Sequence, residues 1–388
     1  TDVFTLTAGG LTRANSLDLP PEAEAMRTEI RAEAERIAKL EDKAQLDELI
    51  ATGLPDDPYL FSLLHSYFPR ALRERFTVVA INDPADLASI AYLTRFDSTH
   101  GRFPGSVELG DGCLLVGGAS IPVFHASKPD GVPWKKLGVD ILVEASGQYS
   151  YRHELNDFLV AGCARVLLSH PGHGAADVDQ TVVYGFNEAA LSGSERIVSA
   201  ASCTTNAVVP MLALLDEAYG LERVLLTTLH SVMNDQPLID GYHHSDLNRT
   251  RSAMQSMIPV ATGLARGVVR LLPALEGRVE AKAIRVPVVN VSAIDLVVSL
   301  SRPVRVEDVT NLLRNAADGC GSGRMAYTCE PHASIDFNHS LHSAIIDGQQ
   351  IRLSGDRLLN LLVWFDNEWG FANRMLDVAA CWSDRLSS

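Results

Sequence analysis

Basic residues are scarce in this chain. Lysine and arginine number 33 against 48 aspartates and glutamates, which gives a formal net charge of −15 over 388 residues. An acidic surface of this kind repels the phosphates of nucleic acids and membranes, so we expect neither as a partner. Any anionic ligand must therefore be bound by a few local bases.

Long apolar runs and paired cysteines are also missing. No run approaches the roughly 20 apolar residues of a membrane span, and residues 1–19 lack a basic segment followed by an apolar one. The six cysteines lie far apart without a Cys-x-x-Cys pair, which disfavours a disulfide scaffold and a metal site. The sequence therefore predicts a soluble, cytoplasmic protein with no metal site.

What is present predicts an α/β fold. Short β-branched runs alternate with helical stretches at 76–81, 141–144, 165–168 and 181–184. This alternation is typical of a mostly parallel, Rossmann-like sheet. After residue 203 the pattern changes to one helical stretch followed by longer strand-like runs at 224–229, 281–286 and 292–300. That change predicts a second, α+β domain with a mixed or antiparallel sheet.

These patterns define three expected regions. Residues 1–52 form a divergent, largely helical segment, in which 20–49 carry apolar residues at the spacing of an amphipathic helix. Residues 53–202, together with 367–388, form a Rossmann-like dinucleotide-binding domain. Residues 203–366 form the catalytic domain.

Cys203 has the neighbours that a nucleophile needs. A strand-like run ends in small residues just before it, and an apolar helical stretch follows. Free N–H groups and the dipole at a helix start favour the thiolate, while Ser202 and Thr204 can cap the helix or donate to an anion. His230 ends the next strand-like run, so we predict Cys203 and His230 as a catalytic pair.

A second set of residues is basic or hydroxylic. Arg249, Thr262, Gly263 and Arg285 lie on expected loops and strand ends. Guanidinium groups beside a Thr-Gly pair suit forked recognition of a phosphate. For each arginine taken singly, an ordinary surface ion pair is the alternative.

Short motifs follow one another along the chain: SCTTN at 202–206, TTLHS at 227–231, RTR at 249–251, AIRVP at 283–287 and DNEWG at 366–370. In order and spacing they resemble the glyceraldehyde-3-phosphate dehydrogenase superfamily, over residues 76–382. The resemblance implies that Cys203 attacks an aldehyde and that His230 activates the thiol and accepts the hydroxyl proton. Hydride then passes to NAD, and water or phosphate resolves the thioester.

The resemblance also assigns binding residues and an assembly. It implies that the substrate and its phosphate are bound by Ser202, Thr204, Arg249, Thr262, Gly263 and Arg285. It implies that NAD is bound by Asn82, Asp83, Ser146, Gly147, Ser169 and Asn367. The partner is then a phosphorylated small-molecule aldehyde, and the family suggests a homotetramer.

Two details favour the erythrose-4-phosphate dehydrogenases within the superfamily. Met233 lies three residues after His230, where glyceraldehyde-3-phosphate dehydrogenases typically have a threonine that helps to bind phosphate, and a thioether cannot donate that bond. The segments around 234–243 and 369–377 also resemble the erythrose enzymes, with Phe371 in place of the usual tyrosine. The product would be 4-phosphoerythronate, which in that family supplies vitamin B6 (pyridoxal phosphate) synthesis. A phosphorylating glyceraldehyde-3-phosphate dehydrogenase is the alternative.

The glycine-rich turn that opens the cofactor domain of both families is missing. In its expected place, residues 51–58 contain one glycine, two prolines and two acids, and negative charge there would repel a pyrophosphate. The other candidate is the run 3–13, a strand-like segment with Gly9-Gly10, which would make it a displaced first strand.

Three hypotheses follow from this departure. The first is an active NAD-dependent enzyme with a rebuilt cofactor loop. The second is a cofactor-free descendant whose thiol does ester hydrolysis, acyl transfer or redox sensing. The third is a non-catalytic binding subunit. The presence of Cys203, His230 and Asn367 together favours the first, because Asn367 has no obvious role without a nicotinamide.

Overall fold

The computed structural model describes residues 4–7, 10–13, 76–233, 235–241, 246–319, 321 and 323–386. The chain forms two compact units. Unit 1 comprises residues 1–78, 87–97 and 101–121, and unit 2 comprises residues 79–86, 98–100 and 122–388. The expected helix over 20–49 and the segment 51–58 lie outside the described residues, and the division into functional domains stays a prediction.

Unit 1 contains short strands and one described helix. Its elements are β1 (Phe4–Thr7), β2 (Gly10–Arg13), α4 (Leu87–Arg95), β4 (Phe96–Asp97), β5 (Gly101–Arg102), β6 (Val107–Leu109), β7 (Cys113–Val116) and the start of β8 (Ala119–Phe124). β6 and β7 pair antiparallel, as do β4 and β5. Short antiparallel pairs therefore dominate this unit.

The run 3–13 does not form the displaced first strand of a Rossmann domain. β1 pairs antiparallel with β2, and Gly10 itself is a strand residue opposite Thr7. A first Rossmann strand leads through glycines into a helix, whereas here the residues after the glycines return along β1. This candidate for the cofactor loop is therefore wrong.

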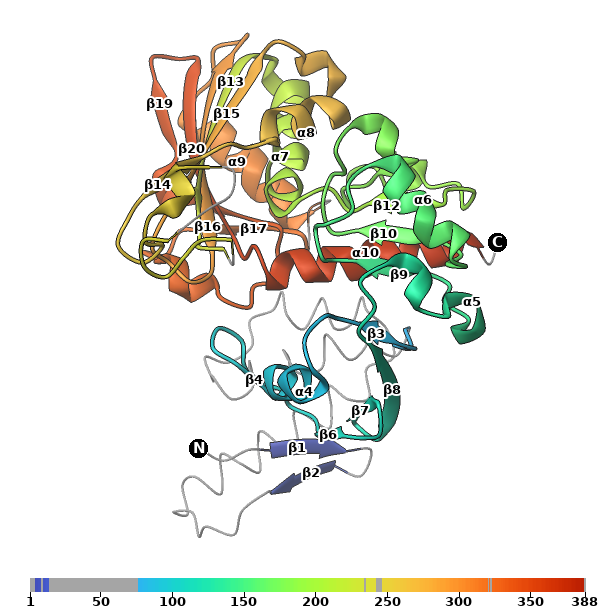
Figure 1. Ribbon diagram of the computed structural model, residues 1–388. Helices are drawn as coiled ribbons and strands as arrows, with labels where there is room; N and C mark the ends of the chain where they lie inside the picture. The colour runs from blue at the N-terminus through green and yellow to red at the C-terminus, as the bar shows by residue number, and fades with distance from the viewer. Residues whose placement is uncertain are drawn as a thin grey trace, which may run out of the picture. The chain divides into compact units, whose positions relative to one another are not determined.

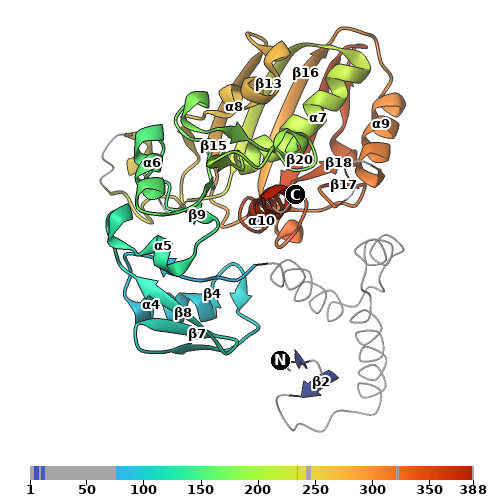
Figure 2. The ribbon, with the colours of Figure 1, turned by 90° about the vertical axis from the view of Figure 1, so that its right-hand side faces the viewer.

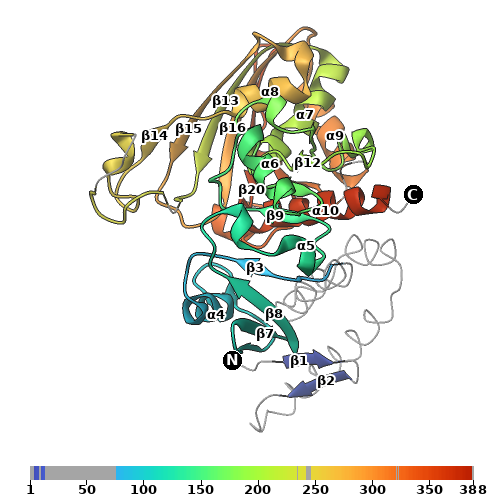
Figure 3. The same ribbon diagram turned by 45° about the vertical axis from the view of Figure 1, so that its right-hand side comes forward.

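A parallel sheet in unit 2 matches the expected Rossmann-like pattern. Its strand order is β11 (Gln180–Thr181), β12 (Ile197–Ser199), β10 (Val166–Leu168) and β9 (Leu142–Glu144). All neighbours are parallel. β10 and β12 are buried throughout, as expected for strands covered on both faces. The helix α6 (Arg152–Val160) lies beside this sheet (Figure 3).

Two of the expected strands are shorter in the structure. Only β3 (Ile81–Asn82) forms within 76–81, pairing parallel with the end of β8, and among the described strands none pairs with residues 76–80. The run 181–184 leaves the sheet after Thr181. The backbone of this run forms hydrogen bonds with the Asn187 side chain instead of with a neighbouring strand. The side-chain amide of Asn187 accepts from the Val183 N–H and donates to the Thr181 carbonyl, both at 2.8 Å.

The larger sheet of unit 2 is mostly antiparallel. Its order is β14 (Ile258–Val260), β15 (Val279–Arg285), β13 (Leu221–His230), β16 (Ser292–Leu300), β20 (Leu358–Phe365), β18 (Ala344–Asp347) and β17 (Met325–Thr328), with β19 (Arg352–Ser354) beside β20. Only β13–β15 and β17–β18 are parallel pairs. The mixed sheet expected for the catalytic region is therefore confirmed.

Helices cover one face of this sheet. They are α7 (Cys203–Tyr219), α8 (Leu264–Leu271) and α9 (Val306–Asp318), seen side on in Figure 1 and from the helical side in Figure 2. β16 alternates accordingly, with Leu296 and Val298 fully buried in the core and Val297 only partly buried. α7 also continues past Pro210, which lacks the N–H that would donate to the carbonyl one turn earlier.

The C-terminal helix α10 (Trp369–Leu386) runs past the parallel sheet and contacts α7 (Figure 1). Trp382 is fully buried. At Gly193, a Cβ atom would lie 2.7 Å from the Arg385 carbonyl oxygen. A larger residue at this position would therefore clash with α10. Among the described residues, no helix combines the length and the apolar character needed to cross a bilayer.

Opposite faces of β16 give a matched stability test. Val298→Ala should lower the free energy of unfolding by about 2 kcal/mol, because it removes two buried methyl groups from packed surroundings. Val297→Ala, one residue away on the other face, should cost less than half as much. Denaturant unfolding of both variants measures the difference, and equal losses would contradict the assigned core face.

Candidate active site

A strained turn connects β12 to the nucleophile. After Ser199, Ala201 adopts a left-handed backbone with φ of +63°, an uncommon conformation for a residue other than glycine. Its N–H donates to the Ser199 hydroxyl at 3.0 Å. Ser202 then caps α7, since its Oγ accepts from the Thr205 N–H at 3.2 Å. Cys203 is thereby the first residue of the helix, as the sequence predicted.

The thiol of Cys203 faces the imidazole of His230. The Sγ and Nε2 atoms are 3.9 Å apart, and His230 is the last residue of β13. This distance allows a hydrogen bond to sulfur and direct proton transfer between the two groups. The fold therefore brings the sequence-predicted pair together, and its catalytic role stays a prediction.

Burial controls the charge state of this pair. It raises the pKa of the Cys203 thiol to about 11, although the Thr204 N–H and the Arg285 charge act in the opposite direction. It also lowers the pKa of His230 to about 4, and the charge of Arg285 adds to that lowering. The helix start favours the thiolate as expected, but desolvation outweighs it. At neutral pH both groups are uncharged.

The other ring nitrogen of His230 has two neighbours. Nδ1 lies 2.9 Å from the Ser231 carbonyl oxygen and 2.5 Å from an Arg285 guanidinium nitrogen. Arg285 is the last residue of β15 and is the register partner of His230 in the parallel β13–β15 pair. The strand pairing therefore sets the guanidinium beside the imidazole.

Four of the six residues expected to bind the substrate and its phosphate lie at two helix starts, Ser202 and Thr204 at α7 and Thr262 and Gly263 at α8. Gly263 caps α8, and the Thr262 hydroxyl accepts from the Leu264 N–H at 3.2 Å. α8 packs against α7, where a Cβ atom at Gly267 would lie 3.0 Å from the Thr205 hydroxyl. Both helices therefore offer free N–H groups of the kind that bind anions.

Arg249 is paired with two aspartates. Its guanidinium contacts Asp235 at 2.5 Å and Asp246 at 3.3 Å. The pKa of Arg285 is lowered by burial, with Asp235 and Arg249 acting on it in opposite directions, so these charges lie near one another. Arg249 therefore forms the ion pairs that were the alternative to phosphate binding in the sequence analysis. Its role in binding phosphate stays a prediction.

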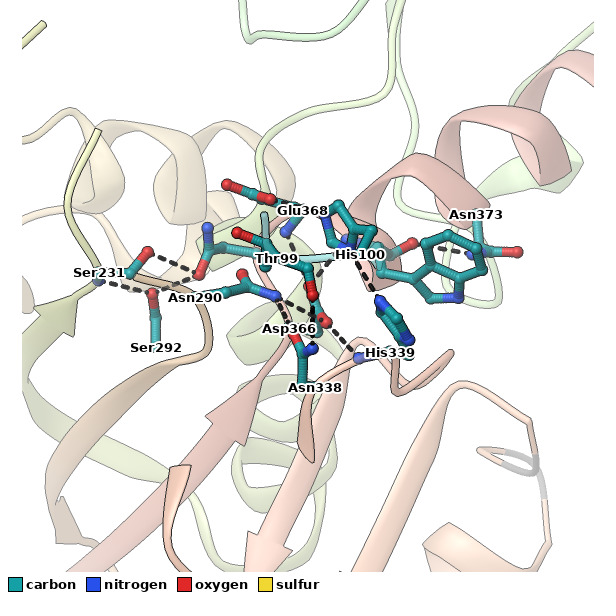
Figure 4. Close-up of polar contacts among 12 residues, drawn as sticks. Thr99, His100, Ser231, Asn290, Ser292, Asn338, His339, Asp366, Glu368 and Asn373 are labelled. Atoms are coloured by element: carbon teal, nitrogen blue, oxygen red, sulfur yellow. Dashed lines mark hydrogen bonds and ion pairs between the residues drawn. The ribbon is translucent and has the colours of Figure 1, made fainter. Parts of the chain in front are cut away.

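Asn367 is fixed in one amide orientation. Its Oδ1 accepts from the Ser231 hydroxyl at 3.0 Å and from the Ser292 hydroxyl at 2.7 Å. With two donors on the oxygen, the amide NH₂ is the group left to meet a ligand, which fits the carbonyl oxygen of a nicotinamide carboxamide. Figure 4 shows Ser231 and Ser292 side by side at this contact.

The neighbouring Asp366 holds the strand end in place. Its carboxylate accepts from the N–H groups of Glu368 and Trp369, at 3.0 and 2.7 Å, at the start of α10. The same carboxylate accepts from Asn290 at 3.0 Å and from the His339 N–H at 2.8 Å (Figure 4). Asp366 therefore joins the start of α10 to the segments around Asn290 and His339, and it positions the adjacent Asn367.

Ser146, Gly147 and Ser169 lie at the carboxyl edge of the parallel sheet. They follow β9 and β10, and the Ser169 N–H donates to the Glu144 carbonyl at 3.0 Å, which joins the two strand ends. Gly147 has a φ of +70°, which other residues rarely adopt. This edge is where open α/β sheets bind dinucleotides, so these residues fit a cofactor.

Asn82 and Asp83 follow β3, as expected. The Asn82 amide bonds the Ala126 backbone in both directions, donating at 3.1 Å and accepting at 2.9 Å. One Asp83 carboxylate oxygen accepts from the Ala85 N–H at 2.8 Å. The second oxygen of Asp83 is therefore the better candidate for a ribose hydroxyl, and the role of Asn82 in cofactor binding stays a prediction.

Sequence reasoning missed the residues that support the site. Ser231, Ser292 and Asn290 anchor Asn367 and Asp366, yet serine and asparagine at strand ends are too common to stand out. Val291 and His339, which adjoin them, have φ values of +67° and +68°. Neither is a glycine, so the sequence carries no signal of these strained positions.

His230 should make stability depend on pH. Its pKa is about 4 in the folded chain and about 6.5 when unfolded. Below pH 6.5 the unfolded chain therefore binds a proton that the folded chain does not. As the pH decreases from 6.5 to about 4, the contribution of His230 should lower the free energy of unfolding by up to about 1.4 kcal/mol per pH unit. Denaturant unfolding of His230→Asn should show a shallower decline, with a constant offset from wild type above pH 7.5; parallel curves would contradict the pKa assignment.

Comparison with known families agrees with this geometry. Residues 65–152 match the family model of the glyceraldehyde 3-phosphate dehydrogenase NAD binding domain, and residues 202–367 match that of its C-terminal domain. The two matches together cover more than half of the chain. The second begins at Ser202 and ends at Asn367, so it includes the thiol, the imidazole and the amide described above. The chain therefore belongs to the glyceraldehyde-3-phosphate dehydrogenase family, and its cofactor is NAD.

Proposed function

We propose that this protein oxidises erythrose 4-phosphate to 4-phosphoerythronate with NAD. The observation that carries the chemistry is the contact of Cys203 with His230 at 3.9 Å, beside Arg285. The choice of substrate is supported by Met233, which follows this site and is 45% exposed. Its thioether offers no hydrogen bond to the phosphate that a threonine would help to bind in the triose enzymes.

The pair performs the first step. His230 takes the proton from the Cys203 thiol, and the thiolate sulfur bonds to the aldehyde carbon of the substrate. The carbonyl oxygen becomes a hydroxyl, and His230 accepts its proton as the carbon loses hydride. NAD supplies the hydride acceptor. The product on the sulfur is a thioester.

Release of the acid needs a second nucleophile. We propose that His230 first releases to solvent the proton that it has accepted. Water then attacks the thioester, with its proton passing to the neutral His230, so that the carbon–sulfur bond breaks; the leaving thiolate takes that proton and the Cys203 thiol is restored. Phosphate in place of water would give an acyl phosphate, as in the alternative triose reaction. The acid released by water, 4-phosphoerythronate, would then serve as a precursor for vitamin B6 synthesis.

Substrate positioning falls to the two helix starts and the arginines. We propose that Thr262, Gly263 and Arg285 bind the substrate phosphate, with Arg249 turning from its acids to assist. Ser202 and Thr204 bind the polar groups nearest the thiol. A few local bases then bind an anion despite the net charge of −15.

We further propose a homotetramer. Large apolar side chains are exposed on β13 and on the loop that follows it, namely Leu225, Leu238, Ile239, Leu247 and Met257. Exposed apolar groups concentrated in one region favour association with another chain. Sedimentation at equilibrium should give the mass of four chains, and a monomer would contradict this assembly.

Cofactor reduction tests the proposed reaction. Purified protein with NAD and erythrose 4-phosphate should give reduced NAD, measured by its absorbance, at a rate independent of inorganic phosphate. Cys203→Ser should abolish the signal without unfolding the protein, whereas Cys329→Ser, which changes an exposed cysteine, should leave it intact. Phosphate-dependent turnover of glyceraldehyde 3-phosphate would select the triose reaction instead, and absence of both turnover and NAD binding would select a cofactor-free function.

The hydroxyl of Ser292 offers a test of the nicotinamide contact. Ser292→Ala removes one donor to Asn367, so the amide loses part of its fixed orientation. The KM for NAD should rise about fivefold, as expected for the loss of one hydrogen bond of about 1 kcal/mol, with the KM for the aldehyde nearly unchanged. Ser299→Ala, on the same strand but bonded to Glu222, is the matched control. Equal KM values for NAD in both variants would contradict the role of Asn367.

A further inference from the structure

Arg270 joins the helix α8 to the edge of the parallel sheet. It lies in the last turn of α8, where the helix dipole favours a positive charge. The hydrogen bonds that its guanidinium forms with described residues leave the helix. They go to the Pro171 carbonyl at 2.5 Å and to the Thr181 hydroxyl at 3.3 Å. Pro171 follows β10, and Thr181 ends β11.

The loop 169–172 after β10 is therefore held from two elements. The His170 carbonyl accepts from the Ser199 hydroxyl of β12 at 2.7 Å, and the next carbonyl, that of Pro171, accepts from Arg270 of α8. Because the two carbonyls are consecutive, these bonds fix the orientation of the peptide groups between them. Ser169, the predicted cofactor residue, directly precedes them. All of these residues belong to unit 2.

The bond from Arg270 is of a strong kind. A charged donor binds a carbonyl oxygen more tightly than a neutral donor does. Burial lowers the pKa of Arg270, while the charge of Asp177 acts in the opposite direction, so the guanidinium is partly withdrawn from water beside an acid. Pro171 has no N–H, so its carbonyl is the one backbone group through which a hydrogen bond can hold it.

We propose that Arg270 is a positioning residue for NAD, which holds the loop 169–172 in the conformation that receives the cofactor. The inference rests on the proposed role of Ser169 and on the place of this loop at the carboxyl edge of the sheet, where α/β sheets bind dinucleotides. Arg270 acts through the Pro171 carbonyl. The start of α8 then serves the phosphate and its end serves the cofactor.

The physical effect is a change in the population of the binding-competent loop. Without the Arg270 bond the loop adopts further conformations, and the apparent Kd for NAD rises in inverse proportion to the fraction that remains competent. The Ser199 bond to His170 still holds one side of the loop. We therefore expect weaker binding of NAD with the fold preserved.

The alternative is a purely structural role. Arg270 would then fasten α8 to the parallel sheet and contribute to stability alone. Its replacement would lower the free energy of unfolding while the folded protein bound NAD as the wild type does. Measurements of NAD affinity and of unfolding on the same variants separate these two roles.

Calorimetric titration with NAD, without aldehyde, measures the affinity directly. Arg270→Met removes the donors and keeps an unbranched side chain. Its Kd for NAD should rise about tenfold, as expected for loss of one charge-assisted hydrogen bond. Arg270→Lys keeps the charge and a donor for a single acceptor, so its Kd should rise only about two- to threefold.

Arg278 provides a matched control. Its guanidinium also donates to a backbone carbonyl, that of Leu221 at 3.1 Å, but Leu221 begins β13 at the end opposite His230. Arg278→Met should therefore bind NAD as the wild type does. Denaturant unfolding of each variant gives the temperature range in which all are folded, and the titrations are compared there.

Kinetics give a second readout. With erythrose 4-phosphate, Arg270→Met should raise the KM for NAD in parallel with the Kd. At saturating NAD its kcat should stay within about twofold of wild type, because the catalytic pair does not contact the loop bond. A lowered kcat with an unchanged KM for NAD would contradict a positioning role.

A wild-type Kd for NAD in Arg270→Met would overturn the proposal, whatever the stability of that variant. An equal rise in Arg278→Met would do the same, and so would a wild-type protein that does not bind NAD. If Arg270→Met does not fold, Arg270→Lys decides, and a wild-type Kd in it is contradictory. The titration uses no aldehyde, so a failure of the proposed oxidation is visible separately.

Discussion

Desolvation of two adjacent side chains is the constraint on which the rest of the site depends. Burial disfavours both the Cys203 thiolate and the His230 imidazolium, so the neutral forms of both side chains are favoured. A buried pair of this kind gains its charges together, since each ion then stabilises the other at short range. The helix start and Arg285 matter because the Thr204 N–H and the Arg285 charge act on that joint transition.

The fold delivers the two members from different sheets. β12 of the parallel sheet leads through the strained Ala201 into α7, and β13 of the mixed sheet ends at His230. Asp366 fixes the start of α10, which places Asn367 against Ser231, the residue after the imidazole. The amide of Asn367 and the imidazole of His230 are thus connected through Ser231.

Much of this arrangement could be predicted from the sequence. The strand before Cys203, the long strands of the mixed sheet and the position of His230 at a strand end followed from hydrophobic pattern and motif order. The shortened run at 181–184 could not, because the side chain of Asn187 bonds the backbone there. The candidate cofactor loop at 3–13 proved to be an antiparallel pair of strands, because a glycine pair after a short strand suits both a hairpin and a phosphate loop.

The parallel register of β13 and β15 limits how the lengths of these strands can change in evolution. Side chains alternate between the faces of a strand, so inserting one residue into β15 would turn Arg285 to the opposite side while His230 stayed in place. The two strands can therefore change in composition but not independently in length. The described residues 235–241 and 246–257 lie outside this strand pairing, so insertions and deletions there would leave Arg285 beside His230.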